Sequence, residues 1–126
     1  MKTIPTRAAD VSLDDQGIIH MTFTQNSKIT LSDAQEIFRV RRELEPNRSK
    51  QLLLLDMRAT PGANREARFY SKKKEVIDTT QAMAMIVENY SSQILGNFFL
   101  GFIRGDYPVR LFTDEESAVK WLKSKE

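Results

Sequence analysis

The chain has 126 residues, with 19 basic and 17 acidic side chains and a formal net charge of +2 at pH 7. A chain of this length forms about one domain and can be stable without metals or disulfides. It contains no cysteine, which excludes disulfides, thiol nucleophiles and Cys-ligated metal sites, and its single histidine cannot build a His-rich metal site. Because the charges are nearly balanced and interspersed, the sequence does not favour a nucleic-acid partner.

The N-terminus lacks the apolar core of a signal peptide, and no apolar run approaches the roughly 20 residues that span a bilayer. We therefore expect a cytoplasmic protein without a membrane partner. Residues 1–126 are expected to form one domain, with residues 1–10 as a loosely ordered N-terminal segment.

The first predicted elements are two short antiparallel strands. Apolar and polar residues alternate over residues 18–24, which is the two-residue period of a half-buried strand. Asp14-Asp15-Gln16-Gly17 precedes this strand as a hairpin turn, so a partner strand is expected over residues 11–13. His20 falls on the same side as Thr22, and we interpret it as a surface or half-covered strand residue.

The next predicted element is a helix that Thr30 caps and that stops at Pro46. Asp33 lies in its first turn, where the helix dipole favours an anion. The apolar residues at helical spacing are Ala34, Ile37, Phe38 and Leu44. The residues expected on the solvent side of this helix are Arg39, Arg41, Arg42, Glu43 and Glu45.

Two later strands are predicted to be buried on both faces, as central parallel strands are. Residues 51–57 include the run Leu52-Leu53-Leu54-Leu55, and residues 79–87 end in another continuous apolar run. Between them, Pro61-Gly62 breaks the chain before a helix expected over residues 64–77.

The last predicted elements are a helix over residues 92–104, a strand over residues 109–112 and a terminal helix that Thr113 and Glu116 open as a capping box. The order ββαβαβαβα predicts a single-domain α/β fold. Right-handed crossovers place the helices on both faces, or mainly on one, of a mixed sheet of about four or five strands.

The helix over residues 92–104 has a wider apolar surface than its own sheet requires. At 100° per residue its apolar side chains cover about 180°, whereas a surface helix needs a stripe of about 100°. The surplus indicates contact with a subunit or partner, with neighbouring helices of the core, or with an apolar ligand. The residues expected at an oligomer interface are Phe98, Phe99 and Phe102.

A second candidate site follows the leucine-rich strand, because open parallel sheets bind ligands beyond the carboxyl ends of their strands. Basic residues recur along the helix over residues 64–77, and its N-terminal amides suit a phosphate or carboxylate. The alternative is a charged helix face in solvent. The candidate partner- or anion-binding residues are Arg58, Thr60, Asn64, Arg65 and Arg68.

The sequence lacks the motifs of common enzymes and cofactor-binding proteins. It has no Gly-x-Ser-x-Gly elbow, and no Gly-rich phosphate loop lies between a strand and a helix. No nucleophile, base and orienting group are brought together by their spacing. We therefore expect no catalytic residue, no metal and no cofactor.

Several segments are similar to those of a known family. They are Ile29-Thr30-Leu31 with Ala34, Leu55-Asp56-Met57-Arg58, Ile94-Leu95-Gly96-Asn97-Phe98-Phe99, and Tyr107-Pro108-Val109-Arg110-Leu111-Phe112-Thr113 with Trp121-Leu122. With these segments and its element order, the chain resembles STAS domains, the SpoIIAA-like fold of anti-sigma-factor antagonists and of sulfate-transporter tails. It is most similar to a small uncharacterised bacterial group of STAS-like proteins.

The resemblance implies a binding or regulatory module that acts by protein–protein interaction, with a protein partner or with itself as a homodimer. Antagonist STAS domains are switched by phosphorylation of a serine in an Asp-Ser-Ser-Gly-like run. This chain departs from that pattern, because Ala63-Asn64-Arg65-Glu66 carries no hydroxyl there. STAS-like folds are also similar to lipid carriers of the CRAL-TRIO type, which implies a small apolar ligand as the alternative function.

Overall fold

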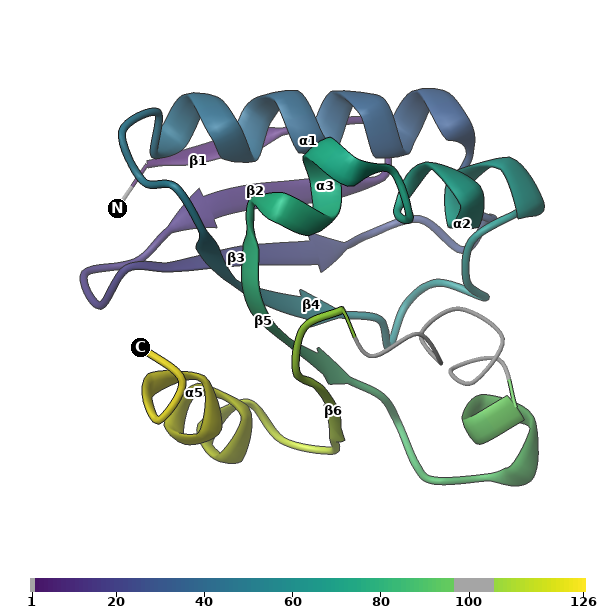
Figure 1. Ribbon diagram of the computed structural model, residues 1–126. Helices are drawn as coiled ribbons and strands as arrows, with labels where there is room; N and C mark the ends of the chain where they lie inside the picture. Colours follow the sequence, from purple (N-terminus) through teal and green to yellow (C-terminus); the bar gives the residue numbers. More distant parts are fainter. Residues whose placement is uncertain (1, 97–105) are drawn as a thin grey trace.

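The computed structural model describes residues 2–96 and 106–126, which form a mixed sheet with helices on both faces (Figure 1). In chain order the elements are β1 (Thr3–Pro5), β2 (Ala9–Leu13), β3 (Ile18–Phe23), α1 (Leu31–Leu44), β4 (Gln51–Asp56), α2 (Arg65–Tyr70), α3 (Lys74–Asp78), β5 (Thr80–Ile86), β6 (Val109–Phe112) and α5 (Glu115–Lys123). The α/β fold expected from the sequence is confirmed.

The sheet has six strands in the order β1-β2-β3-β4-β5-β6, rather than the four or five expected. The first two pairs are antiparallel, and the pairs from β3 to β6 are parallel. The additional strand is β1, which pairs Thr3 with Ser12 and Pro5 with Asp10 at the edge of the sheet. An edge strand tolerates proline, since one of its sides needs no ladder hydrogen bonds.

The structure describes residues 2–10 of the segment that the sequence predicts to be loosely ordered, and these residues are packed against the sheet and α1. Besides β1, they include Ala8 and Ala9, which are buried in the core. Arg7 forms a two-point ion pair with Asp33 at the start of α1, and its Nε lies 2.6 Å from Asp33 Oδ1. This ion pair and the buried alanines fix the N-terminal segment against the helix.

The central strand β4 contributes side chains to both faces of the sheet, as the leucine run predicts. Leu53 and Leu55 lie in the core cluster under α1 and α2, whereas Leu52 and Leu54 lie in the cluster under α5. Successive strand residues point to opposite faces, so four adjacent leucines serve two cores. β3 and β5 flank this strand with parallel pairing.

The first helical layer consists of α1, α2 and α3 (Figure 1). Thr30 caps α1 as predicted, and with Asp33 it forms a reciprocal capping box. The prediction that Arg41 lies on the solvent side of α1 is wrong, because its side chain is fully buried. Its guanidinium is buried because acceptors on β4, β5 and the end of α3 surround it.

The single helix expected over residues 64–77 is instead two short helices, α2 and α3. Ser71 Oγ donates a 2.6 Å hydrogen bond to the carbonyl of Arg68, and Lys73 adopts an extended conformation with φ −66° and ψ 145°. A side chain that bonds to the backbone of the preceding turn competes with the helical ladder. The break redirects α3 so that it packs beside β5.

The second face of the sheet is covered by α5, whose Ala118 and Leu122 are fully buried against β4, β5 and β6. The residue that caps α5 is Asp114, which accepts a 2.8 Å hydrogen bond from Ser117 N. The predicted cap, Thr113, is therefore wrong by one residue.

Residues 92–96 are helical, and the rest of the helix expected over residues 92–104 lies outside the described residues. Within the described ranges, no helix has the length and apolar character needed to cross a bilayer.

Candidate ligand-binding site

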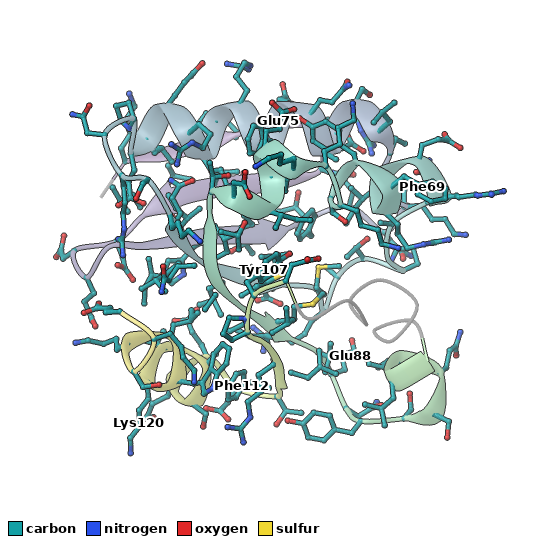
Figure 2. The ribbon with its side chains drawn as sticks, viewed as in Figure 1. Phe69, Glu75, Glu88, Tyr107, Phe112 and Lys120 are labelled. Carbon is teal, nitrogen blue, oxygen red and sulfur yellow. The ribbon has the colours of Figure 1, made fainter. Side chains whose placement is uncertain are left out.

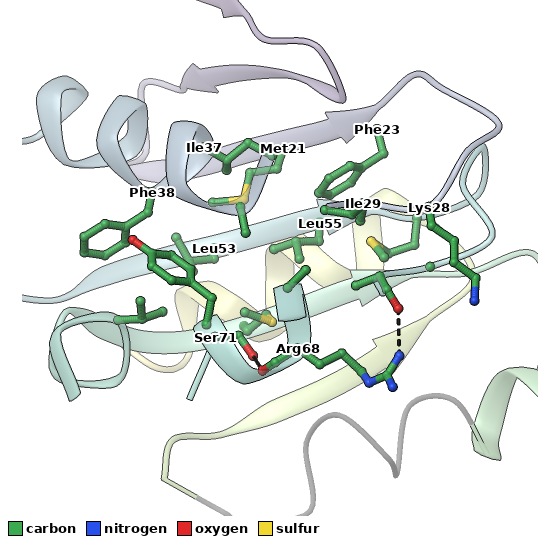
Figure 3. Close-up of a pocket in the computed structure, with 18 of the residues that line it drawn as sticks. Met21, Phe23, Lys28, Ile29, Ile37, Phe38, Leu53, Leu55, Arg68 and Ser71 are labelled. Atoms are coloured by element: carbon green, nitrogen blue, oxygen red, sulfur yellow. Dashed lines mark hydrogen bonds between the residues drawn. The ribbon is translucent and has the colours of Figure 1, made fainter. Parts of the chain in front are cut away.

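A cavity of about 500 Å³ lies between the sheet and the first helical layer (Figure 3). Its floor is formed by side chains of the parallel strands, including Met21, Leu53, Leu55 and Met83. The remaining apolar side chains of the described lining come mostly from the helices and the loops between them: Phe23, Ile29, Ala34, Ile37, Phe38, Met57, Pro61, Ala63, Ala67 and Val76. The lining is therefore mainly apolar.

The cavity exists because the helical layer contributes small residues where it faces the sheet. Ala34 on α1, Ala67 on α2, and Gly62 and Ala63 in the preceding loop all line it. Protein interiors are normally close-packed, so a core of this size with a cavity of ligand dimensions is an unusual arrangement. Short side chains opposite a floor of Met and Leu leave a space that the described side chains do not fill.

The loop at one end of the cavity is held in place by backbone hydrogen bonds. Ile29 N donates to the carbonyl of Gly62 over 2.8 Å, and Asn64 N donates to the carbonyl of Ile29 over 2.9 Å. Gly62 has a φ of +117°, a conformation that favours glycine. Backbone hydrogen bonds therefore hold the loop at this end of the cavity, which we call its entrance, against the residues that precede α1.

The charged residues of the described lining are all cations, namely Lys28, Arg41 and Arg68. Figure 3 shows Lys28 and Arg68 at the same end of the cavity. Arg68 Nη1 donates a 2.7 Å hydrogen bond to the carbonyl of Ala63, and Lys28 is exposed. With no Asp or Glu in the described lining, the electrostatic environment of this end favours an anionic group.

Arg41 lines the inner part of the cavity and is bound by neutral acceptors. Its Nη1 donates to Gln51 Oε1 over 2.5 Å, and its Nη2 donates to Thr79 Oγ1 and Thr80 Oγ1, each over 3.2 Å. Burial, with a smaller contribution from the neighbouring Arg42 charge, lowers the pKa of Arg41 to about 10. The guanidinium therefore stays positively charged at neutral pH beside an apolar space.

Two tyrosines lie within electrostatic range of Arg41. Burial raises the pKa of Tyr107 to about 12 and raises the pKa of Tyr70, and the Arg41 charge opposes both shifts. Both are neutral phenols at physiological pH. Tyr70 lines the cavity, and Tyr107, labelled in Figure 2, packs against the same core.

The structure separates the residues that the sequence grouped as a partner or anion site. Arg58 is paired with Asp56 at 2.7 Å, Thr60 Oγ1 donates to the carbonyl of Ser27 over 3.1 Å, and Asn64 Oδ1 caps α2 by accepting from Ala67 N. Arg65 stacks over Phe69 with 5.3 Å between its guanidinium carbon and the ring centroid. Of the group, Arg68 alone lines the described part of the cavity.

The expected oligomer-interface residues Phe98, Phe99 and Phe102 lie outside the described residues.

The sequence does not predict the cavity itself. The sequence pattern is typical of an ordinary core for most of its apolar lining residues, whereas Arg41 is expected in solvent and Arg68 in the partner or anion site. The run of small residues Gly62-Ala63 followed by Ala67 is the sequence signal that could suggest unfilled space. Within the described ranges, no three His, Asp or Glu side chains are grouped as metal ligands.

The six-stranded sheet with α1, α2 and α3 on one face and α5 on the other is a SpoIIAA-like fold. It is similar to the crystal structure of an uncharacterised DUF3478-family protein with a SpoIIAA-like fold from Shewanella loihica PV-4, with a TM-score of 0.62 and 13% sequence identity over 96% of this chain and 90% of that one. This confirms the STAS-like fold that the resemblance implied. The chain belongs to the family described as Domain of unknown function (DUF7793), which matches residues 11–126.

A second solved structure, a protein of unknown function from Arthrobacter sp. FB24, is 27% identical over 89% of this chain and 96% of that one, with a TM-score of 0.36. No curated protein matches the chain.

Proposed function

We propose that the protein is a non-enzymatic, cytoplasmic binding protein for a small amphiphilic molecule that occupies the cavity between the sheet and α1, α2 and α3. The observation that carries this proposal is a mainly apolar cavity of about 500 Å³. Small-molecule pockets have volumes of roughly 300–1,000 Å³, apolar walls and a few polar groups that orient the ligand. The apolar part of the ligand contacts the floor formed by Leu53, Leu55 and Met83.

The polar part of the ligand is expected to be acidic. Lys28 and Arg68 lie at one end of the cavity, and the buried Arg41 adds a third positive charge to its lining. A carboxylate or phosphate near the entrance would gain charge-assisted hydrogen bonds from the two outer side chains. A long-chain fatty acid is the simplest molecule with this chemistry.

A regulatory module that acts by protein–protein interaction is the second candidate, and the observation that favours it is the exposed ring of Phe69 on α2. The cavity supports ligand binding more directly. Three residues would form the partner surface after β4, and each is already bound: Arg58 to Asp56, Thr60 to the carbonyl of Ser27, and Asn64 to the Ala67 amide. A helix cap explains Asn64, and structural bonds to β4 and to the loop before α1 explain Arg58 and Thr60.

The test is to measure binding of hexadecanoate by displacement of a fluorescent fatty acid, below the critical micelle concentration. The double variant Ala34→Leu/Ala67→Leu places two larger side chains in the cavity. We expect it to weaken binding by about tenfold or more while raising the free energy of unfolding by about 1 kcal/mol, because filled cavities stabilise proteins. Lost binding with gained stability cannot result from misfolding.

Ala59→Leu is the matched control, since Ala59 is exposed and does not line the cavity. It should bind hexadecanoate like the wild type. Equal binding by the wild type and by the cavity-filling variant would contradict the proposal, as would the absence of any saturable binding.

A further inference from the structure

One aromatic side chain of the helical layer is exposed beside the cavity. Phe69 on α2 retains 56% of its accessible surface (Figure 2). Arg65 and Lys72 lie over its ring, at 5.3 and 5.8 Å from the centroid. Neither cation belongs to an ion pair among the described residues, and the acid on the same short helix is Glu66.

This exposed ring lies on the same six-residue helix as residues that line the cavity. Arg68, the residue before Phe69, lines the cavity, and so does Ala67, the residue before Arg68. Lys28 lies at the same end as Arg68 (Figure 3). Phe69 and the cations Lys28, Arg65, Arg68 and Lys72 are called the α2 surface below.

We propose that the α2 surface docks on an anionic lipid membrane. The Phe69 ring lies at the boundary between headgroups and acyl chains, and the amphiphile passes between the membrane and the cavity. The proposal rests on the proposed function, because it assigns the place where the same cavity exchanges its ligand. Aromatic rings flanked by Lys and Arg are typical of peripheral membrane contacts. Such a contact needs no membrane-spanning helix, so this proposal departs from the expectation from sequence that the protein has no membrane partner.

A protein partner fits the α2 surface less well than a membrane. Stable protein interfaces bury roughly 800 Å² on each partner around an apolar core from which charged residues are depleted. Here a single exposed ring is surrounded by cations on a helix of six residues, Arg65–Tyr70. A negatively charged lipid surface matches both features, because it neutralises the cations and accepts one ring.

The experiment is flotation of the full-length protein with vesicles of phosphatidylcholine alone and of phosphatidylcholine and phosphatidylglycerol in equal amounts. We expect binding to the anionic vesicles only, weakened by added salt because the contact is largely electrostatic. Arg65→Glu/Lys72→Glu should weaken binding by about tenfold or more, and Phe69→Ser by about fivefold.

The matched control is Lys120→Glu/Lys123→Glu on α5, which makes the same charge change on the opposite face of the sheet, where both lysines are exposed. It should bind anionic vesicles nearly as tightly as the wild type. Every variant is also tested for hexadecanoate binding in solution, which Phe69→Ser should leave unchanged because Phe69 does not line the cavity.

Three results would overturn the docking proposal. They are absence of binding to anionic vesicles, equal losses in the α2 and α5 charge variants, and wild-type vesicle binding by Phe69→Ser, which would indicate charge adsorption or a site for an acidic macromolecule. If hexadecanoate still binds in solution, the proposed function stands and the docking surface alone is wrong. If vesicles bind through the α2 surface but hexadecanoate does not bind, the proposed function is wrong and the surface serves another purpose.

Discussion

At the scale of single residues, Arg41 shows how a charged side chain can become part of the core. A buried charge is costly unless its donors are satisfied. Arg41 donates to the side chains of Gln51, Thr79 and Thr80 and to the carbonyls of Val76 and Thr79. Gln51 Nε2 in turn donates to the carbonyl of Arg41 over 2.7 Å. One guanidinium therefore connects α1 with β4, α3 and β5.

We predict that Arg41→Met lowers the free energy of unfolding by about 2–4 kcal/mol, because it removes several buried hydrogen bonds and leaves Gln51 Oε1 without its Arg41 donor. The matched control is Arg39→Met, two positions earlier on the same helix. Arg39 is exposed and pairs with the exposed Glu43, so its loss should cost about 0.5 kcal/mol or less. Chemical denaturation measures both, and equal effects of the two variants would show that the Arg41 network is not stabilising.

The lowered pKa of Asp33 predicts that the stability of the fold depends on pH. The hydrogen bond and charge of Arg7, together with bonds from Thr30, lower the pKa of Asp33 from 3.8 to about 2. A carboxyl whose pKa is lower in the folded state stabilises the fold fully above its unfolded pKa, and this contribution disappears as the pH falls toward the folded value. The unfolding free energy should therefore decrease between about pH 4 and pH 2.

Asp33→Asn should remove this part of the decrease, and Arg7→Met should reduce it, since each deletes one partner of the ion pair. Unfolding followed by circular dichroism at several pH values gives the slope for each variant. A slope of the wild-type size in Asp33→Asn would mean that other carboxyl groups cause the acid sensitivity.

At the scale of elements, the two faces of the sheet are packed differently. Under α5, Phe112 and Trp121 lie 5.8 Å apart between ring centroids and help close a core formed with Leu122 and Ala118. Under α1 and α2, the alanines at positions 34 and 67 leave the cavity open. The α5 face therefore serves stability, and the opposite face combines stability with the cavity in which we propose that a ligand binds.

We predict that Leu122→Ala lowers the free energy of unfolding by about 2–4 kcal/mol without changing hexadecanoate affinity, because the lost packing lies on the face away from the cavity. Lys123→Ala, the exposed neighbour on α5, should have little effect on either quantity. A large loss of ligand affinity in Leu122→Ala, under conditions where it is folded, would contradict the separation of the two faces.

The elements that the sequence predicted well have strong local signals. The leucine run identified β4 because four adjacent apolar residues require cover on both faces, and Thr30 with Asp33 identified the start of α1. The break between α2 and α3 was missed because it depends on the Ser71 side chain bonding to the backbone. β1 was missed because a three-residue edge strand has no periodicity of its own.

The candidate site is less predictable from the sequence than the fold, because a cavity depends on how all the layers of the molecule pack. A cavity is the space that remains after the layers pack, so no local pattern of residues specifies it. The sequence placed the site at the loop after β4 and on α2, and Arg68 of that group does lie at the cavity entrance. It could not show that Arg58, Thr60 and Asn64 bind neighbouring groups, because those contacts exist only in the folded chain.

At the scale of the whole molecule, the SpoIIAA-like fold has a core under α5 and, on the opposite face of the sheet, a core with a cavity. The charged residues of the described cavity lining are cations. The measurement that tests this account most directly is native mass spectrometry of the freshly purified protein, before and after addition of hexadecanoate. We predict one bound molecule for each chain, and its loss in Ala34→Leu/Ala67→Leu. Spectra without any bound small molecule, or with equal binding by the cavity-filling variant, would contradict the account.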